Sequence, residues 1–297
     1  MRVVFLGNHT VGVRVLQAMS GMTEVVGVVA HPPDPEDGAR YESVYDFARK
    51  SGWNVIRGKG KDDGVRQFIA AAKPDLLWIT DFRYLLPREI VAVAPMGAVN
   101  LHPSLLPAYR GRASINWAIL KGETKLGLTG HFVDEGMDTG DVIEQLSYEI
   151  CEDQDVGDCL NILYPLYAQI TKSILSHFES GKVPRIPQDH SRATAFPARK
   201  PEDGLIDWKQ PARAVLNLVR AVAAPYPGAF TTVAGKKIVV WKAHVVSEAG
   251  CSTSPGCIVK TTGDEVLVQC AVGTLALTRV ELPGPNTPLQ VGCCLGS

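Results

Sequence analysis

The sequence has no long apolar run, no secretory leader and no surplus of positive charge. None of its apolar runs approaches the roughly 20 residues that span a membrane, and the first residues, MRVVFLG, lack the apolar stretch and cleavage site of a signal peptide. Its 30 Lys and Arg are offset by 31 Asp and Glu, whereas nucleic-acid-binding proteins usually carry a basic surplus. We therefore expect a cytoplasmic protein with no membrane partner and no nucleic-acid partner, although a local basic patch can exist within a neutral total.

The cysteines show no metal-binding pattern. They form an odd set with no C-x-x-C spacing, which predicts scattered reduced thiols and no metal site. The adjacent Cys293 and Cys294 give no indication of a redox role. The seven cysteines are Cys151, Cys159, Cys251, Cys257, Cys270, Cys293 and Cys294.

The first part of the chain alternates short apolar runs with segments of helical periodicity. This alternation predicts an α/β fold with a Rossmann-like, doubly wound and mostly parallel sheet. The turn after the first run lacks G-x-G-x-x-G, so a dinucleotide site is not expected. Strands are predicted at 2–7, 24–31, 54–56, 74–80, 97–102, 126–133 and 142–150, and helices at 11–19, 43–50, 63–72, 113–120 and 156–180.

The pattern changes in the last third of the sequence. A helix at 211–224 is followed by short strands at 229–233, 237–244, 256–260, 266–270 and 274–280, separated by Gly-rich turns. This density of strands predicts a smaller β-barrel-like domain. The predicted organisation is a catalytic domain at 1–185, a linker at 186–203 and a C-terminal helix with a small β-barrel at 204–297.

Polar residues gather after the strand predicted at 97–102, within GAVNLHPSLLPAYRGRASINW. Asn100 and His102 are two residues apart, so their side chains point to the same face of that strand. Asp138 follows in the Gly-rich loop VDEGMDTGD. A single histidine on a strand is more often structural, but the three residues together suffice for acyl transfer to an amine. The imidazole moves protons, the carboxylate orients it and raises its pKa, and the amide stabilises an oxyanion.

The combination N-L-H-P-S-L-L-P-x-Y-R-G, followed by D-x-G-D, resembles the 10-formyltetrahydrofolate-dependent formyltransferases. The likeness continues through Ile206-Asp-Trp208 and Pro225-Tyr-Pro-Gly-Ala-Phe230. It implies 10-formyltetrahydrofolate as formyl donor, His102 as proton shuttle, Asn100 as oxyanion donor and Asp138 as the residue that orients His102.

The resemblance also implies where the folate binds. Tyr84, Leu85 and Leu86 would contact the pterin through their main chain, and Arg112 would lie beside the cofactor. The loop of Asp134, Glu135, Gly136 and Met137, ending at Asp138, would close over it. Pro103 departs from the glycine that the sugar-formylating relative has at this position. Proline has no backbone N–H, which puts any family contact made through a backbone N–H there in doubt.

Two kinds of two-domain relative suggest different acceptors. The stretches DFRYLL and VRAVAAPYPGAF are nearer to the enzyme that formylates UDP-4-amino-4-deoxy-L-arabinose than to methionyl-tRNA formyltransferase. Residues 31–41, HPPDPEDGARY, are acidic where the tRNA enzyme typically carries a basic loop. We therefore predict a nucleotide-linked 4-amino-4-deoxy sugar as acceptor. Its predicted contacts are Asn8, His9, Arg220 and Tyr226.

Other functions stay open at this point. The acceptor could be methionyl-tRNA, or an amino acid or hydroxyornithine, and water in place of the amine would make the protein a hydrolase. A folate-binding scaffold with a degenerate site is the non-enzymatic alternative. Arg110 could brace the loop or meet a phosphate, and the structural role is favoured. A homodimer is common among relatives of this kind, and the sequence leaves the oligomeric state open.

Overall fold

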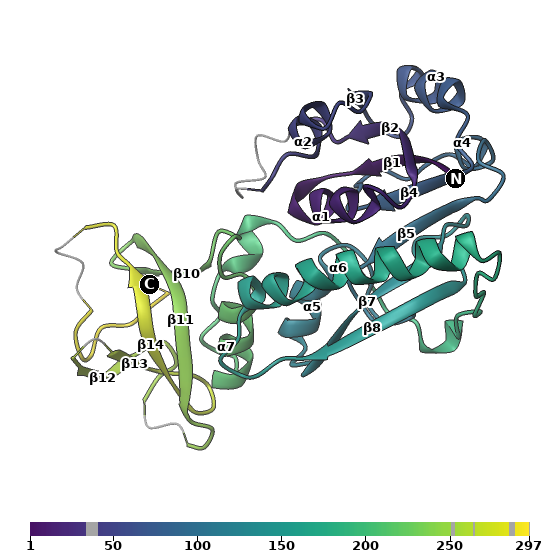
Figure 1. Ribbon diagram of the computed structural model, residues 1–297. Helices are drawn as coiled ribbons and strands as arrows, with labels where there is room; N and C mark the ends of the chain where they lie inside the picture. Colours follow the sequence, from purple (N-terminus) through teal and green to yellow (C-terminus); the bar gives the residue numbers. More distant parts are fainter. Residues whose placement is uncertain (34–40, 251–252, 264, 285–288, 297) are drawn as a thin grey trace. The chain divides into compact units, whose positions relative to one another are not determined.

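The computed structural model describes the chain except for residues 34–40, 251–252, 264, 285–288 and 297 (Figure 1). Most of the acidic stretch and Cys251 therefore lie outside the described residues. Within the described part, no helix combines the length and the apolar character needed to cross a membrane. The chain forms two compact units. The first comprises Met1–Ser114, Lys125–Tyr148 and Leu160–Phe196, and the second Ile115–Thr124, Glu149–Cys159 and Pro197–Ser297.

The first unit is built on a seven-stranded sheet with the strand order β3-β2-β1-β4-β5-β7-β8. The five strands from β3 to β5 pair in parallel, and β7 runs antiparallel to β5. This arrangement confirms the predicted Rossmann-like sheet. The strands are β1 (Arg2–Gly7), β2 (Glu24–Ala30), β3 (Val55–Arg57), β4 (Leu76–Thr80), β5 (Ala98–His102), β7 (Lys125–Phe132) and β8 (Val142–Glu149).

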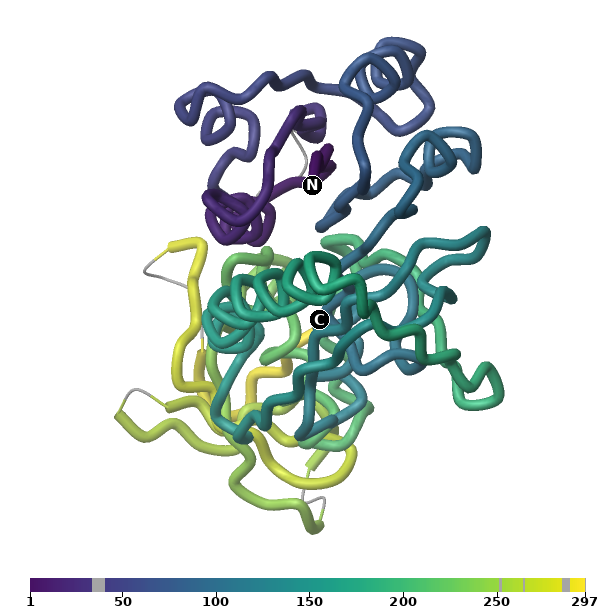
Figure 2. The backbone as a smooth tube through the Cα atoms, turned by 45° about the vertical axis from the view of Figure 1, so that its right-hand side comes forward, coloured from purple at the N-terminus to yellow at the C-terminus, as the bar shows by residue number. Residues whose placement is uncertain are grey.

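Helices cover both faces of this sheet, which explains the continuous apolar run of β1. Val4 and Leu6 pack in the core cluster with residues of α3 and α4, while the Phe5 ring lies against Gly12 of α1. Figures 1 and 2 show α6 running beside the part of the sheet that contains β5 and β7. The helices are α1 (His9–Met19), α2 (Val44–Lys50), α3 (Asp63–Ala72), α4 (Arg88–Val91) and α6 (Val156–Glu179), which begins in the second unit.

The parallel strands bring three chain segments to one edge of the sheet. Gly7 of β1 pairs with Thr80 of β4, and Thr80 pairs with Leu101 of β5. The residues that follow, Asn8, Asp81 and His102, therefore lie at the same level. Ligands of open α/β sheets bind at this carboxyl edge.

The second unit contains a five-stranded antiparallel sheet in the order β10-β11-β14-β13-β12. It confirms the predicted separate C-terminal β domain. Trp208 is buried in this unit and donates its Nε1–H to Thr231 Oγ1 at 3.1 Å. The strands are β10 (Ala229–Val233), β11 (Lys236–Ser247), β12 (Ile258–Thr262), β13 (Glu265–Gln269) and β14 (Thr274–Glu281), with helices α5 (Ser114–Leu120) and α7 (Ala212–Ala221).

Candidate active site

Two neighbouring strands supply the polar residues at the carboxyl end of β5. Asn100 on β5 pairs directly with His131 on β7, so the two side chains share one face of the sheet. Asn100 Nδ2 donates to His131 Nε2 at 3.2 Å, and His131 Nδ1–H donates to the Phe132 carbonyl at 2.8 Å. These partners define the neutral tautomer of His131, with its proton on Nδ1.

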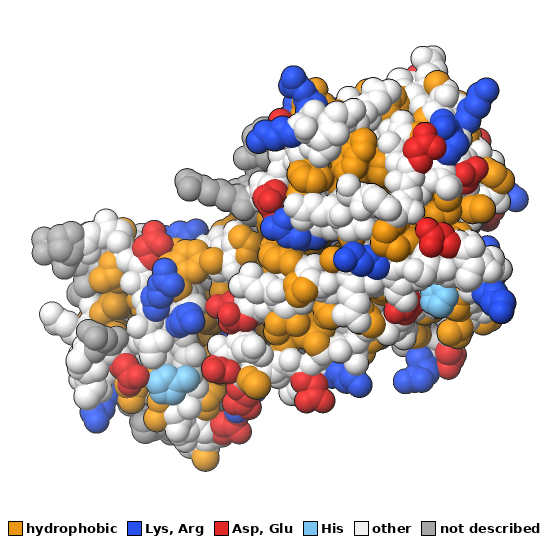
Figure 3. Space-filling view, viewed as in Figure 1, with side chains coloured by type: hydrophobic (Ala, Val, Ile, Leu, Met, Phe, Trp, Pro, Cys, Tyr) orange, Lys and Arg blue, Asp and Glu red, His pale blue; other side chains and the backbone are white. Residues whose placement is uncertain are grey.

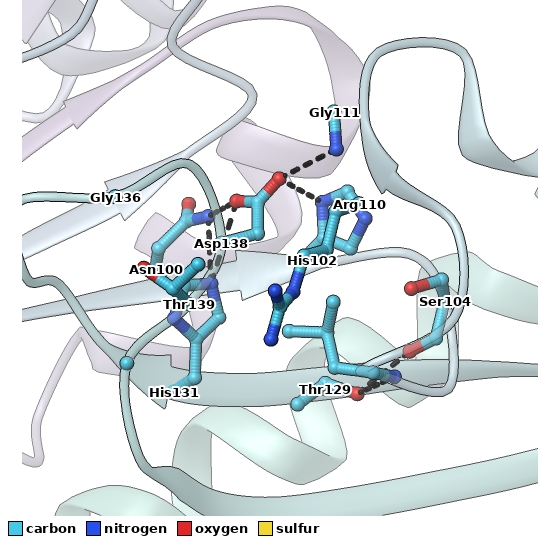
Figure 4. A network of polar contacts seen from close by, with 12 residues as sticks. Asn100, His102, Ser104, Arg110, Gly111, Thr129, His131, Gly136, Asp138 and Thr139 are labelled. Atoms are coloured by element: carbon cyan, nitrogen blue, oxygen red, sulfur yellow. Dashed lines mark hydrogen bonds and ion pairs between the residues drawn. The ribbon is translucent and has the colours of Figure 1, made fainter. Parts of the chain in front are cut away.

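The Asp138 carboxylate lies between these two residues and His102 (Figure 4). Its Oδ1 is 3.4 Å from Asn100 Nδ2 and 3.6 Å from His131 Nε2, and its Oδ2 is 3.6 Å from His102 Nδ1. The side chain is 13 % exposed. The structure thus brings together the three predicted catalytic residues, whose roles stay predictions, and adds His131 to them.

Charge interaction with His102 and hydrogen bonds keep Asp138 ionised. Burial raises the pKa of the carboxyl group, but His102, His131 and the Gly111 N–H together lower the pKa to about 2. The Gly111 N–H donates to Asp138 Oδ2 at 2.8 Å. A carboxylate held in this way presents a fixed negative charge to the neighbouring imidazoles at neutral pH.

His102 is buried, and its two ring nitrogens face different partners. Nε2 is 2.8 Å from the Tyr109 carbonyl, which can only accept, so the neutral ring carries its proton there and presents the Nδ1 lone pair towards Asp138. Burial lowers the pKa of His102, while Asp138 and the Tyr109 carbonyl raise it, and burial prevails. Asp138 therefore raises the pKa of His102, as predicted, but burial lowers it by more.

Arg110 holds the backbone of the Asp138 loop through a second side chain. Its guanidinium is buried and donates to Gln188 Oε1 from Nη2 at 2.6 Å and from Nε at 3.2 Å. Gln188 Nε2 donates in turn to the carbonyls of Asp138 at 2.9 Å and Gly140 at 2.7 Å. Asp138 itself has a φ of 55°, a conformation that L residues rarely adopt, and this double clamp holds it there.

Gly111 occupies a position that requires glycine. It belongs to β6 (Arg110–Gly111), which pairs in parallel with β9 (Ala195–Phe196). Its φ is 94°, and a Cβ atom there would lie 2.4 Å from the Phe196 carbonyl oxygen. The close approach of these two chains aims the Gly111 N–H at Asp138.

A residue of β7 holds the loop after His102 in place. Thr129 pairs with His102, and its hydroxyl donates to the Ser104 carbonyl at 2.6 Å and accepts from the Leu106 N–H at 3.3 Å. Ser104 Oγ donates to the Ala108 carbonyl at 2.7 Å. The loop is therefore rigid where it presents the Tyr109 carbonyl to His102.

The predicted folate contacts lie in the same unit as the catalytic cluster. The Tyr84 ring stacks on His31 with centroids 4.8 Å apart, Leu86 packs on the core, and Leu85 is 64 % exposed. Arg112 is exposed and donates its backbone N–H to the Phe196 carbonyl.

The loop predicted to close over the folate is exposed from Asp134 to Met137. Asp134 Oδ1 accepts from the Gly136 N–H and the Thr139 hydroxyl. Glu135 forms an exposed ion pair with Arg88 at 2.9 Å, and Met137 is 50 % exposed. All of these contacts stay predictions.

The predicted acceptor residues fall into separate places. Asn8 precedes α1, and His9 Nδ1 lies 2.6 Å from Asp81 Oδ2 at the carboxyl edge of the first unit. Arg220 and Tyr226 belong to the second unit. There the Arg220 guanidinium is buried and donates to the carbonyls of Gln154 at 2.8 Å and Cys151 at 2.9 Å, so it has a structural role in α7. Whether any of the four contacts an acceptor stays a prediction.

Sequence reasoning missed four residues of this edge: His31, Asp81, His131 and Gln188. His131 stood in a predicted strand, and only its register with β5 reveals that it faces Asn100. Asp81 directly follows a predicted strand, which was a usable signal, whereas nothing local marks Gln188. Among the described residues, no group of three His, Cys, Asp or Glu is arranged to hold a metal ion.

Comparison with known proteins identifies the fold and the family. The formyl transferase family model matches residues 1–164, and the model of the formyl transferase C-terminal domain matches residues 199–288. The chain is 36 % identical over 286 residues to the methionyl-tRNA formyltransferase of Acetivibrio thermocellus, a match that covers 95 % of this chain and 92 % of that protein.

Solved structures of low sequence identity share the fold. WlaRD, a sugar 3N-formyltransferase crystallised with dTDP and 5-N-formyl-THF, superposes with a TM-score of 0.70 at 18 % identity, covering 93 % of this chain and 96 % of that one. HypX from Aquifex aeolicus gives 0.65 at 20 % identity and covers 97 % of this chain, which spans only 45 % of HypX. Both domain matches and the full-length relative place this chain in the formyl transferase family.

Proposed function

We propose that the protein is an N-formyltransferase that moves a formyl group from 10-formyltetrahydrofolate to the amine of a nucleotide-linked 4-amino-4-deoxy sugar. The observation that carries the chemistry is the cluster of Asn100, His102 and Asp138 at the carboxyl edge of the sheet. There the ionised Asp138 carboxylate lies 3.4 Å from the Asn100 amide and 3.6 Å from the neutral His102 imidazole. The folate supplies the formyl group and leaves as an amine.

Asn100 has one N–H available for the developing oxyanion. Its Nδ2 has two hydrogens, and the shorter contact, 3.2 Å to His131, fixes one of them. The contact with Asp138 is longer, at 3.4 Å. The hydrogen of this weaker contact can turn to the formyl oxygen as charge develops on it, which stabilises the transition state.

His102 takes the proton that the attacking amine loses. The neutral ring has its free lone pair on Nδ1, and protonation there produces an imidazolium flanked by the Asp138 carboxylate and the Tyr109 carbonyl. Its lowered pKa keeps His102 neutral, and hence able to accept, at neutral pH. An amine with a pKa of roughly 8 is partly deprotonated under the same conditions, so a modest base is sufficient.

The described residues fit a bound folate. His31 donates Nδ1–H to the Pro32 carbonyl, and its buried Nε2 has no hydrogen-bond partner within the described part of the chain. This atom adjoins the Tyr84 ring, in the segment predicted to meet the pterin. Leu85 and Met137 present apolar surface, and the exposed Arg112 suits a carboxylate of the folate tail.

Charge supports a small acceptor over a tRNA. The formal net charge is -1, and residues 31–41 carry three acidic residues and one Arg. On the face shown in Figure 3, Lys and Arg side chains are interspersed with Asp and Glu and form no continuous basic surface. A protein that neutralises several phosphates needs such a surface. At the catalytic edge, the half-exposed Asp81 carboxylate can accept hydrogen bonds from the hydroxyls or the amine of a sugar.

Methionyl-tRNA is the second candidate acceptor. It is favoured by the full-length relative from Acetivibrio thermocellus, whose 36 % identity extends over both family domains. The chemistry at Asn100, His102 and Asp138 would be the same, because both acceptors offer a primary amine.

A tetrahydrofolate-release assay separates these functions. The enzyme is incubated with 10-formyltetrahydrofolate and, in parallel, UDP- and dTDP-linked 4-amino sugars, methionyl-tRNA, or no acceptor. We expect turnover only with a nucleotide amino sugar. Turnover with methionyl-tRNA alone would replace the proposed acceptor, turnover without any acceptor would indicate a hydrolase, and folate binding without turnover would indicate a scaffold.

A further inference from the structure

Cys257 and Cys294 are separated by 37 positions, yet they face each other across an isolated antiparallel bridge in the second unit. Two backbone hydrogen bonds flank the pair. The Ile258 N–H donates to the Cys293 carbonyl at 2.9 Å, and the Leu295 N–H donates to the Gly256 carbonyl at 2.8 Å. Bonds placed on either side of the two cysteines make them a non-hydrogen-bonded pair, the kind in which opposing side chains come closest.

This backbone geometry meets the requirement for a disulfide. Cα atoms of a non-hydrogen-bonded pair are about 4.5 Å apart, within the range of about 4.4–6.8 Å found for disulfides. The two Sγ atoms lie 2.6 Å apart, so the thiols point at each other. No disulfide is present among the cysteines of the described residues. The adjacent Cys293 and Cys294 suggested nothing of this kind, because the partner of Cys294 lies 37 positions earlier in the chain.

The bridge lies where the C-terminal segment joins the domain. Leu295 is buried, and the Gly296 N–H donates to the Thr232 carbonyl on β10 at 2.7 Å. A Cβ atom on Gly256 would lie 2.6 Å from the Leu295 carbonyl oxygen, so the two chains are in close contact. A covalent link at this point would tie the last residues of the chain to the segment that leads into β12.

We propose that Cys257 and Cys294 form a reversible disulfide that latches the C-terminal segment to the β domain. Cys294 is exposed and Cys257 is half-buried, so Cys294 is the attacking thiol. The hydrogen bond between the two thiols, followed by burial, raises the pKa of Cys257.

The reaction is a thiol–disulfide exchange with a small disulfide such as glutathione disulfide. Cys294 loses its proton and attacks one sulfur, forming a mixed disulfide and releasing one glutathione thiolate, which takes up the proton. Cys257 then loses its proton and attacks Cys294 Sγ, and the second glutathione leaves as its thiol. The protein loses two protons and two electrons, and one glutathione disulfide takes them up to become two glutathione thiols.

The test uses the full-length protein equilibrated with mixtures of reduced and oxidised glutathione, quenched by acid and alkylated. We expect peptide mapping to find a Cys257–Cys294 cross-link that dithiothreitol removes. Oxidation should raise the melting temperature of the β domain by roughly 5 °C, because the bond closes a long loop of the unfolded chain. It should also slow carboxypeptidase removal of the C-terminal residues.

Four variants provide the comparison. Cys294→Ser and Cys257→Ser should each abolish the cross-link, the melting shift and the protection, whereas Cys293→Ser and the exposed Cys151→Ser should retain all three. Cys294 lies at the surface, so its substitution tests the latch even if Cys257→Ser folds poorly. A cross-link that instead joins Cys293 to Cys294, or that involves Cys251, would overturn the proposal. So would the absence of any intramolecular bond under oxidising conditions.

Discussion

Two neighbouring parts of the same sheet edge differ in how tightly their polar residues are held. At the end of β5, the side chains of His102, His131 and Asp138 are 7 %, 3 % and 13 % exposed, and each has several polar partners. At the ends of β1 and β4, His9 and Asp81 are 15 % and 36 % exposed, and one 2.6 Å contact joins them. The polar partners of the first group fix its geometry. In the second group, His9 and Asp81 can exchange their mutual contact for contacts with water or a ligand.

We propose that this difference separates reaction chemistry from acceptor choice. A buried carboxylate remains ionised only if hydrogen bonds and charges replace its hydration, so the residue types around Asp138 are tightly constrained. The Asp81 side chain is 36 % exposed, so its contact with His9 contributes less to stability and tolerates change. On this proposal the end of β5 carries formyl transfer, and the ends of β1 and β4 distinguish between acceptors. Five predictions test this division, in order of decreasing effect.

Replacing His102 should have the largest effect on activity. His102→Gln removes the proton acceptor and should lower kcat by about 10²- to 10⁴-fold, measured by tetrahydrofolate release. His177→Gln is the control, because His177 is a half-exposed histidine on α6 that pairs with Glu144 at the surface. Retention of activity by His102→Gln, or equal losses in both variants, would exclude His102 as the base.

Asn100→Ala should come next, because it removes the donor to the oxyanion and leaves the base in place. We expect kcat to fall by about 10²- to 10³-fold, with little change in melting temperature, since the side chain is only partly buried. Kinetics and melting curves are measured on the same preparation. A loss of stability that matches the loss of activity would show that Asn100 supports the fold instead of the reaction.

Gly111→Ala should misplace Asp138 without changing any reacting group. The new Cβ would meet the Phe196 carbonyl at 2.4 Å, and the φ of 94° adds strain, so we expect a loss of roughly 1–3 kcal/mol in stability with a larger relative loss of activity. Gly21→Ala is a matched control, because its φ is 82° but no atom lies within 4 Å of the new Cβ. Full activity in a folded Gly111→Ala protein would contradict the proposed role of this N–H.

The same division explains what the sequence could predict. The alternating apolar runs located the strands. The residue types at Asn100, His102 and Asp138 indicated acyl transfer to an amine, and the resemblance to the formyltransferases supplied the formyl donor. His131 and Gln188 were missed because they depend on strand register and on a contact between residues 50 positions apart. The pairing of β6 with β9 was missed too, since a two-residue strand has no periodicity to detect.

His9→Ala should alter acceptor binding with little effect on the chemical step. Removing one hydrogen-bonding partner at the edge should raise the KM for the acceptor by roughly tenfold, with kcat and the KM for the folate unchanged. Arg14→Ala is the control, because Arg14 lies farther along α1 and forms a surface ion pair with Glu42. A fall in kcat with an unchanged acceptor KM would instead assign His9 to the chemistry, and the contrast between the two groups would disappear.

The smallest effect is a shift in the titration of His102, measured by NMR of protein labelled with ¹⁵N-histidine. Burial lowers the pKa below the ordinary value of 6.5, so the folded ring should be neutral at pH 6.5, with its proton on Nε2. Because the unfolded chain binds this proton more readily, His102 should reduce stability as pH falls below 6.5, and this reduction should level off once the folded protein is also protonated. Asp138 acts in another range, since its stabilising contribution is lost as pH falls from 3.8 to about 2.

The same titration, repeated in Asp138→Asn, tests the coupling between the two groups. The carboxylate raises the pKa of His102 against the effect of burial, so its removal should lower that pKa further and leave the ring neutral over a wider range of pH. His177→Gln should leave the His102 titration unchanged. A His102 pKa that rises in Asp138→Asn would mean that the carboxylate is not the charge that His102 faces, and the proton transfer at Nδ1 would have to be reassigned.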